Sequence, residues 1–225
     1  VVSLQAREVL PLLTPLTSPQ TSDQQQALEL LRAWDGTMSG DSAAAAIYAA
    51  WMQRLPRALA GDELGAWLID RYEGRHSFTA PFLRTTLAQP NSAWCDDVTT
   101  SAIESCTTIV TEALDAALAD LRTRLGATMT NWRWDKVHIT AFPHQPFDSV
   151  PSLQRFFSRS IGNGGDSSTV NVGHFGCEGA KPNPQQRQEQ RISVRSFVCE
   201  RPYEQHAIPG YRQIIDLSQP DGGRF

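Results

Sequence analysis

The first 125 residues carry apolar side chains at the three- and four-residue steps of amphipathic helices. Within an alanine-rich segment, Ile47, Trp51 and Leu55 follow one another at four-residue steps, which suits close packing of neighbouring helices. The pattern predicts helices at residues 1–13, 23–34, 42–59, 63–72 and 77–87. The first of these has no evident N-terminal cap, and Pro11 is expected to end its regular part before a polar linker.

The clearest helix is predicted over residues 101–125, where Ser101 and Glu104 have the spacing of a capping box. Its apolar stripe keeps a period of about 3.6 residues. The members of the stripe are Ile103, Val110, Leu114, Ala117, Leu121 and Leu125. Gly126 is expected to end this helix. The pattern predicts a central support of the fold, with Leu114 and Leu121 buried.

After residue 131 the period changes from that of a helix to that of a strand. Val137, Ile139 and Ala141 alternate with polar residues, which predicts a strand. Further strands are predicted at 168–175, 192–198 and 211–217, with Gly and Pro clustered between them. Helices followed by segregated, mainly antiparallel strands predict an α+β fold, with a helical region at 1–126 and a strand-rich region at 127–225.

The composition and charge of the chain argue against several classes of protein. The chain has 225 residues, 40% hydrophobic and 20% charged, as in an ordinary globular protein. Its formal charge is -4, and the basic residues are scattered, which argues against a nucleic-acid partner. No apolar stretch approaches the ~20 residues of a membrane span, and no signal peptide is recognisable.

Four cysteines allow three pairings, and their spacing lacks the short repeats of a zinc site. Two local bridges are preferred, Cys95 with Cys106 and Cys177 with Cys199. They would indicate an oxidising compartment, the periplasm or the outside of the cell. The alternative is four reduced, buried cysteines.

No catalytic residue can be assigned from the sequence. The histidines are His76, His138, His144, His174 and His206. None has a carboxylate at a fixed short offset, and Pro143 argues against one strand carrying both His138 and His144, so structural roles are favoured. A Ser-His-Asp triad stays open because its members need not be close in sequence, but no Gly-x-Ser-x-Gly segment nominates a serine. Asp166 and Asn171 are further polar candidates for shaping a site.

The glycine-rich segment 162–166 has two interpretations. It could cradle a phosphate through backbone N–H groups, but the lysine and helix of a P-loop are missing. A hairpin turn is therefore the preferred interpretation.

Several stretches together resemble the penicillin acylases, a family of N-terminal-nucleophile amidases. They are LLRAWDG (30–36), SAAAAIYAAW (42–51), SAWCDD (92–97), ESC (104–106), NWRWDKVHITAFPHQPF (131–147), IGNGGDSSTVNVGHF (161–175) and PGYRQIIDLSQPDGGRF (209–225). Asp135 stands where the family often has glycine. The order of these stretches is similar to that in the C-terminal part of the family's large chain.

The resemblance implies a periplasmic or secreted precursor that cuts itself into two chains and hydrolyses the amide bond of an N-acyl substrate, which could be a penicillin, an acyl-homoserine lactone or a related compound. A serine freed at the N-terminus of the large chain would be the nucleophile, within an αββα sandwich. Val1 has no hydroxyl and Ser3 is not at that position, so the resemblance places no catalytic, cofactor-binding or metal-binding residue in this chain. The family's oxyanion-hole Asn and any calcium ligands would lie upstream, and another family segment would follow Phe225.

The expected partners are therefore the remaining parts of the same precursor and a small N-acyl compound. The chain is expected to be a piece of a longer one with an architectural role. A hypothesis of a different class is a stand-alone, disulfide-stapled binding module without catalysis.

Overall fold

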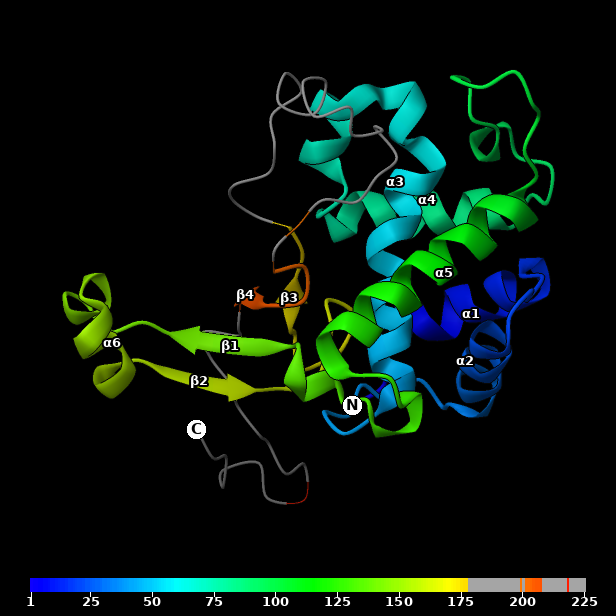
Figure 1. Cartoon of the computed structure of the whole chain (residues 1–225). Helices are drawn as coiled ribbons and strands as arrows, with labels where there is room; N and C mark the ends of the chain where they lie inside the picture. The colour runs from blue at the N-terminus through cyan, green and yellow to red at the C-terminus, as the bar shows by residue number, and fades with distance from the viewer. Residues whose placement is uncertain (178–198, 200, 208–217, 219–225) are drawn as a thin grey trace.

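A computed structural model describes residues 1–177, 199, 201–207 and 218, and within them helices precede strands (Figure 1). The helices are α1 (Leu4–Leu16), α2 (Ser22–Ala33), α3 (Ala43–Tyr72), α4 (His76–Leu87), α5 (Cys106–Leu125) and α6 (Pro151–Phe157). The strands are β1 (Ile139–Phe142), β2 (Arg159–Gly162), β3 (His174–Phe175) and β4 (Gln205–Ala207). Short 3-10 helices are η1 (Ala93–Cys95), η2 (Met129–Asn131), η3 (Trp134–Lys136) and η4 (Phe147–Ser149). This order confirms the α+β prediction.

The described strands form one small sheet in the order β2-β1-β4-β3. β1 pairs with β2 and β3 with β4 in antiparallel fashion, while β1 and β4 are parallel at Thr140 and Gln205. The sequence patterns missed β2, β4 and α6. The strands predicted at 192–198 and 211–217 lie outside the described residues.

The strand predicted at 168–175 is wrong except at its end. Only His174 and Phe175 are in a strand. The preceding residues form a turn, because the Thr169 hydroxyl donates to the backbone oxygens of Asp166 (2.9 Å) and Asn171 (2.8 Å). Val170, counted as a strand residue, is 94% exposed.

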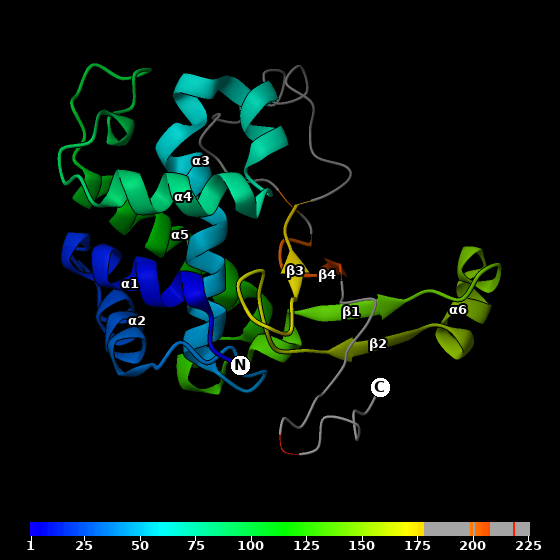
Figure 2. The same ribbon diagram turned by 180° about the vertical axis from the view of Figure 1, so that it is seen from behind.

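The core lies where α3 and α5 cross, and α1, α2 and α4 pack around them (Figure 2). The alanines at the start of α3 are buried, so neighbouring backbones can approach closely. The Trp51 indole N–H donates to the backbone oxygen of Val110 at 3.1 Å and joins the two helices. Leu114 and Leu121 are fully buried, which confirms the predicted central role of this helix.

Helix α1 corrects two expectations. Ser3 caps its N-terminus by accepting from the backbone N–H of Ala6 at 3.2 Å. The helix runs through Pro11 and Pro15 to Leu16. Both prolines are exposed, so the carbonyl groups that lose a hydrogen bond to them can be hydrated.

The start of α5 also differs from the prediction. The helix begins at Cys106 with Ser105 as its cap, and the capping box at Ser101 and Glu104 does not form. Glu104 instead accepts from the backbone N–H of Asp97 at 2.9 Å, while its own N–H donates to Asp96 at 3.0 Å. These bonds hold the segment before α5 as a loop.

Helix α3 unites the two helices predicted at 42–59 and 63–72, with a break at Gly65, where φ is +70°. The Arg57 guanidinium, which is fully buried, binds Asp70 and donates from Nε to Glu73 at 2.6 Å. This ion pair ties the segment after the break to the segment before it.

Both predicted disulfides are present. Cys95–Cys106 joins η1 to the first turn of α5, and Cys177–Cys199 joins the end of β3 to the chain before β4. No described cysteine is free.

Replacing Cys95 and Cys106 together with alanine should lower the free energy of unfolding by about 2–4 kcal/mol, because the bridge restricts the unfolded chain. Chemical denaturation would measure the loss. Thiol titration of the oxidised, unfolded parent chain should find no free thiol, and four titratable thiols would contradict the bridges.

None of the described helices combines the length and the apolar character needed to cross a membrane.

Candidate functional site

His138 lies at the junction between the helices and the sheet, not in an open site. Its fully buried ring stacks on Trp134, with centroids 4.5 Å apart and planes 6° apart, and meets the edge of Phe175 at 5.4 Å. Its Nδ1 is 2.9 Å from the backbone oxygen of Tyr203. The packing gives His138 a structural role between β1 and the segment that leads into β4.

Tyr203 anchors that segment to the helices. Its hydroxyl accepts from Arg54 at 3.0 Å and donates to Asp120 Oδ2 at 2.6 Å, and Arg54 also pairs with Asp120 at 3.2 Å. Burial raises the pKa of Tyr203 well above its ordinary value. The phenol therefore keeps its proton and remains a hydrogen-bond donor to Asp120.

Asp166 lies in a second polar cluster, where the loop after β2 meets the start of α1 and α4. Its carboxyl is almost fully buried, and Oδ1 accepts from the backbone N–H of Ser168 at 2.7 Å. Its own backbone N–H donates to the Thr169 hydroxyl at 3.0 Å. Burial raises the pKa of Asp166, because a charged carboxylate is poorly solvated there.

His76 and Ser168 in this cluster form the closest approach to a Ser-His pair. Nε2 of His76 is 2.6 Å from the Ser168 hydroxyl. Burial lowers the pKa of His76, while nearby Asp166 raises it. The Asp166 carboxyl is bonded to the backbone N–H of Ser168, and among the described residues no hydrogen bond joins it to the imidazole. The acid thus does not orient the base as a triad requires.

The space beside this cluster is too small for a substrate. The cavity measures about 40 Å³, and Tyr48, Glu73, His76 and Asp166 line it. That volume holds about one water molecule, whereas small-molecule sites are usually about 300–1,000 Å³. We therefore assign no nucleophile here, and the cluster secures the N-terminus of α1.

The remaining candidates are His144, Asn171 and His206, and His144 lies apart from both clusters. His144 is exposed and stacks on Phe147, with centroids 5.1 Å apart, near α6. Asn171 lies in the turn before β3, and His206 lies in β4. Asn171 is joined to Asp166 through Thr169, whose hydroxyl lies 2.9 Å from the Asp166 backbone oxygen and 2.8 Å from that of Asn171. His138 and Asp166 lie on either side of Phe175, which contacts His138 and lines the Asp166 cavity.

The segment 162–166 is neither a hairpin turn nor a phosphate cradle. β2 and β3 are not neighbours in the sheet. The N–H of Gly165 donates to the backbone oxygen of Met38 at 2.8 Å. A Cβ on Gly164 would lie 2.5 Å from that same oxygen, so glycine allows the loop to approach the start of α3.

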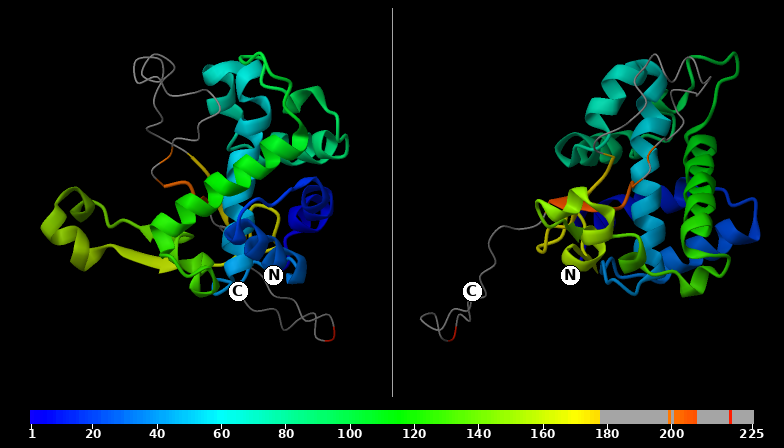
Figure 3. Two further views of the ribbon diagram at one scale, coloured as in Figure 1. Left: turned by 45° about the vertical axis from the view of Figure 1, so that its right-hand side comes forward. Right: turned by 60° about the vertical axis from the view of Figure 1, so that its left-hand side comes forward.

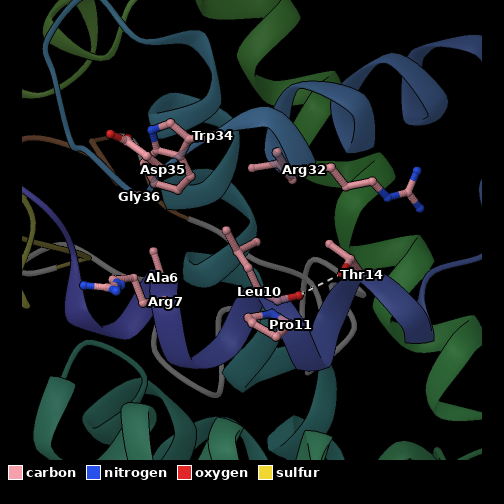
Figure 4. A pocket seen from close by; sticks show the side chains of 10 residues that line it. Ala6, Arg7, Leu10, Pro11, Thr14, Arg32, Trp34, Asp35 and Gly36 are labelled. Carbon is pink, nitrogen blue, oxygen red and sulfur yellow. Dashed lines mark hydrogen bonds between the residues drawn. The ribbon is translucent and has the colours of Figure 1, made fainter.

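A groove of about 280 Å³ lies between α1 and the end of α2, with Leu10, Leu31 and Trp34 among its lining (Figure 4). Arg7 and Arg32 are at its rim and point in opposite directions in Figure 4. Their guanidinium groups therefore do not converge on one ligand.

A larger groove of about 550 Å³ follows one face of β1 and β2. Within its lining, Arg124 binds Asp120 at 2.9 Å and Arg201 binds Glu204 at 3.2 Å. The groove is also lined by Ser160, and among the described residues no hydrogen bond joins its hydroxyl to a side chain that could act as a base.

Comparison with known proteins decides the family. The family model for penicillin amidase matches residues 1–225. The chain belongs to the penicillin amidase family. Relatives in this family include the acyl-homoserine lactone acylase QuiP of Pseudomonas aeruginosa, 26% identical over 213 residues, which are 92% of this chain and 24% of that protein. The QuiP acylase of Pseudomonas syringae pv. tomato is 31% identical over 173 residues, 71% of this chain and 20% of that protein. The chain thus spans about a quarter of the length of these penicillin amidase relatives or less.

The structure also permits a pH test of Asp166. Because its folded-state pKa is raised, its favourable contribution is complete below the unfolded pKa and is lost as the pH rises through the folded pKa. Asparagine cannot ionise. The free energy of unfolding of Asp166→Asn, minus that of the parent, should therefore increase as the pH rises from about 3 and then level off.

The matched control for this test is Asp35→Asn. Hydrogen bonds from Thr37 lower the pKa of the exposed Asp35, so the corresponding difference should change in the opposite direction. Denaturation curves at several pH values would measure both. A difference for Asp166→Asn that does not vary with pH would contradict the buried, proton-binding carboxyl.

Proposed function

We propose that this chain is the architectural part of an acylase that hydrolyses an N-acyl amide, with an acyl-homoserine lactone as the substrate class. The observation that carries the proposal is the family match over the whole chain together with the named activity of the relatives.

The proposed reaction needs groups that lie outside the chain. A serine hydroxyl at a free N-terminus attacks the amide carbon, the C–N bond breaks, and the departing amine takes a proton. Water then hydrolyses the acyl-serine ester, releasing the carboxylate and restoring the serine. The half-buried His76–Ser168 contact beside a cavity of about 40 Å³ supports a structural role for this chain in that reaction.

The compartment and metal content are part of the proposal. Two disulfides favour the periplasm or the outside of the cell. No group of three or more His, Cys, Asp or Glu side chains that could hold a metal occurs within residues 1–177 and the few described beyond them. We propose that any calcium of the full enzyme is bound by ligands elsewhere, as the family resemblance implies.

The test compares the full precursor with the 225-residue chain, using acyl-homoserine lactones of several acyl lengths and a chromogenic N-acyl amide. The precursor should release homoserine lactone and free acid, and the 225-residue chain should release neither. Turnover by the 225-residue chain that disappears in His138→Gln or His144→Gln would contradict the proposal. A full gene product without an N-terminal-nucleophile activity would favour the alternative, a disulfide-stapled binding module.

A further inference from the structure

Residues 139–162, which comprise β1, η4, α6 and β2, form an arm that extends from the helical body (Figures 1 and 2, and Figure 3, left). Neither η4 nor α6 has a buried residue. All four residues of β2 are exposed.

The arm is apolar although it is exposed. Its large exposed apolar side chains, with their exposed fractions, are Phe142 (44%), Val150 (42%), Phe156 (58%), Phe157 (46%) and Ile161 (56%). Single exposed apolar side chains are normal on protein surfaces, but several on one projecting unit mark an interaction surface.

The arm has few contacts that hold it in place. β1 pairs with β4 at one position, Thr140, so most of the arm resembles a two-stranded hairpin, which is marginal in water by itself. The seven residues of α6 are also far fewer than the ~12–15 that an isolated helix needs. Fully burying one phenylalanine side chain contributes about 1.5–3 kcal/mol. A partner surface that covered Phe142, Phe156 and Phe157 would therefore stabilise the arm.

The arm has one carboxylate, Asp148, and two guanidinium groups, Arg155 and Arg159, so its excess positive charge favours a partner with acidic side chains. Arg155 lies over the Phe156 ring at 4.8 Å, and Arg159 donates to the backbone oxygen of Phe156 at 2.7 Å. Neither guanidinium forms an ion pair with a carboxylate of the residues that the structure describes. β2 is also at the edge of the described sheet, so its outer side can accept a further strand.

We propose that the arm is the docking surface for another part of the same acylase polypeptide, which adds an apolar strand flanked by acidic side chains along β2. This inference rests on the proposed function. The chain spans 24% of one relative's length, so proteins of this family contain other polypeptide that can cover the arm. A second copy of this chain, or its own residues outside the described ranges, are the competing occupants.

The first test uses no substitution. Hydrogen exchange of residues 142–161 is compared between the 225-residue chain and the full precursor. The proposal predicts fast exchange in the 225-residue chain and at least about tenfold slower exchange in the precursor. Equal protection in the 225-residue chain would assign the covering to its own residues. Equal, fast exchange in both would show that nothing covers the arm, and either result overturns the proposal.

The second test uses Phe156→Asp and Ile161→Asp, with Ile103→Asp and Val170→Asp as controls that are exposed outside the arm. In the 225-residue chain all four should leave the denaturation midpoint nearly unchanged. In the precursor, the arm variants alone should reduce the yield of folded protein severalfold. Equal effects of arm and control variants would contradict the proposal.

Light scattering on the 225-residue chain resolves the remaining alternative. A dimer that Phe156→Asp dissociates would assign the surface to a second copy. Hydrogen exchange, the yield of folded precursor and the mass from light scattering do not depend on catalysis. If only the substrate assay fails, the proposed function is rejected, but the proposed docking of the arm is not.

Discussion

Replacing Arg57 with methionine should lower the free energy of unfolding by about 3–5 kcal/mol, among the largest effects of any single substitution in the chain. The guanidinium is fully buried between Asp70 and Glu73, whose side chains are 15% and 3% exposed. Methionine fills part of the space but leaves two buried carboxylates without their cation. Chemical denaturation at neutral pH would measure the loss.

The control is Arg84→Met, which removes an ion pair to Glu8 whose partners are 57% and 55% exposed. Solvent-exposed pairs typically contribute about 0–1 kcal/mol. Similar losses for the two variants would show that Arg57 is not paired inside the protein. Double replacement of Asp70 and Glu73 by their amides in the Arg57→Met background should restore part of the stability, since no buried charge then remains.

Replacing Leu121 with alanine should cost about 2–5 kcal/mol, because it removes a fully buried side chain from the contact of α5 with its neighbours. Ile103→Ala is the matched control, since both residues belong to one apolar pattern but Ile103 is 90% exposed. Its effect should stay within about 0.5 kcal/mol. A loss below that value for Leu121→Ala in chemical denaturation would show that the stripe faces solvent.

Leu121 is buried and Ile103 is exposed although both belong to one apolar pattern, and this contrast shows how far the sequence could predict the fold. Period and spacing located α2 and α4 to within one residue at each end, found the two parts of α3 as separate helices and found the end of α5, because each helix buries a repeated stripe of apolar side chains. The two disulfides followed from even count and local spacing. The start of α5 could not be found this way, because the bonds of Glu104 to Asp97 and Asp96 compete with a helical cap.

The strand-rich region was less predictable, for a different physical reason. β2 and β4 are only four and three residues long, so the alternation that marks a strand has almost no length in which to appear. Val170 looks like a strand residue, but a threonine hydroxyl turns the chain beside it. A β-branched residue alone could not reveal that local bond.

The polar clusters had no sequence signal at all. The His76–Ser168 contact joins residues 92 positions apart, and nothing near either residue indicates the other. No catalytic residue was assigned because no histidine has a carboxylate at a fixed short offset and no Gly-x-Ser-x-Gly segment nominates a serine. The family resemblance then placed the nucleophile elsewhere, and the comparisons establish the family without testing that placement.

The hydrogen bonds of Tyr203 have a consequence for the order in which the chain folds. Its partners Arg54 and Asp120 lie 149 and 83 residues earlier, so the bond network can close only after both helices exist and the chain has returned to them. A contact between residues far apart in the sequence costs loop-closure entropy before it stabilises the fold, so such contacts tend to form late. During synthesis the helices can pair while the polypeptide is still growing, but β1 cannot gain its parallel neighbour until residue 205 has emerged from the ribosome.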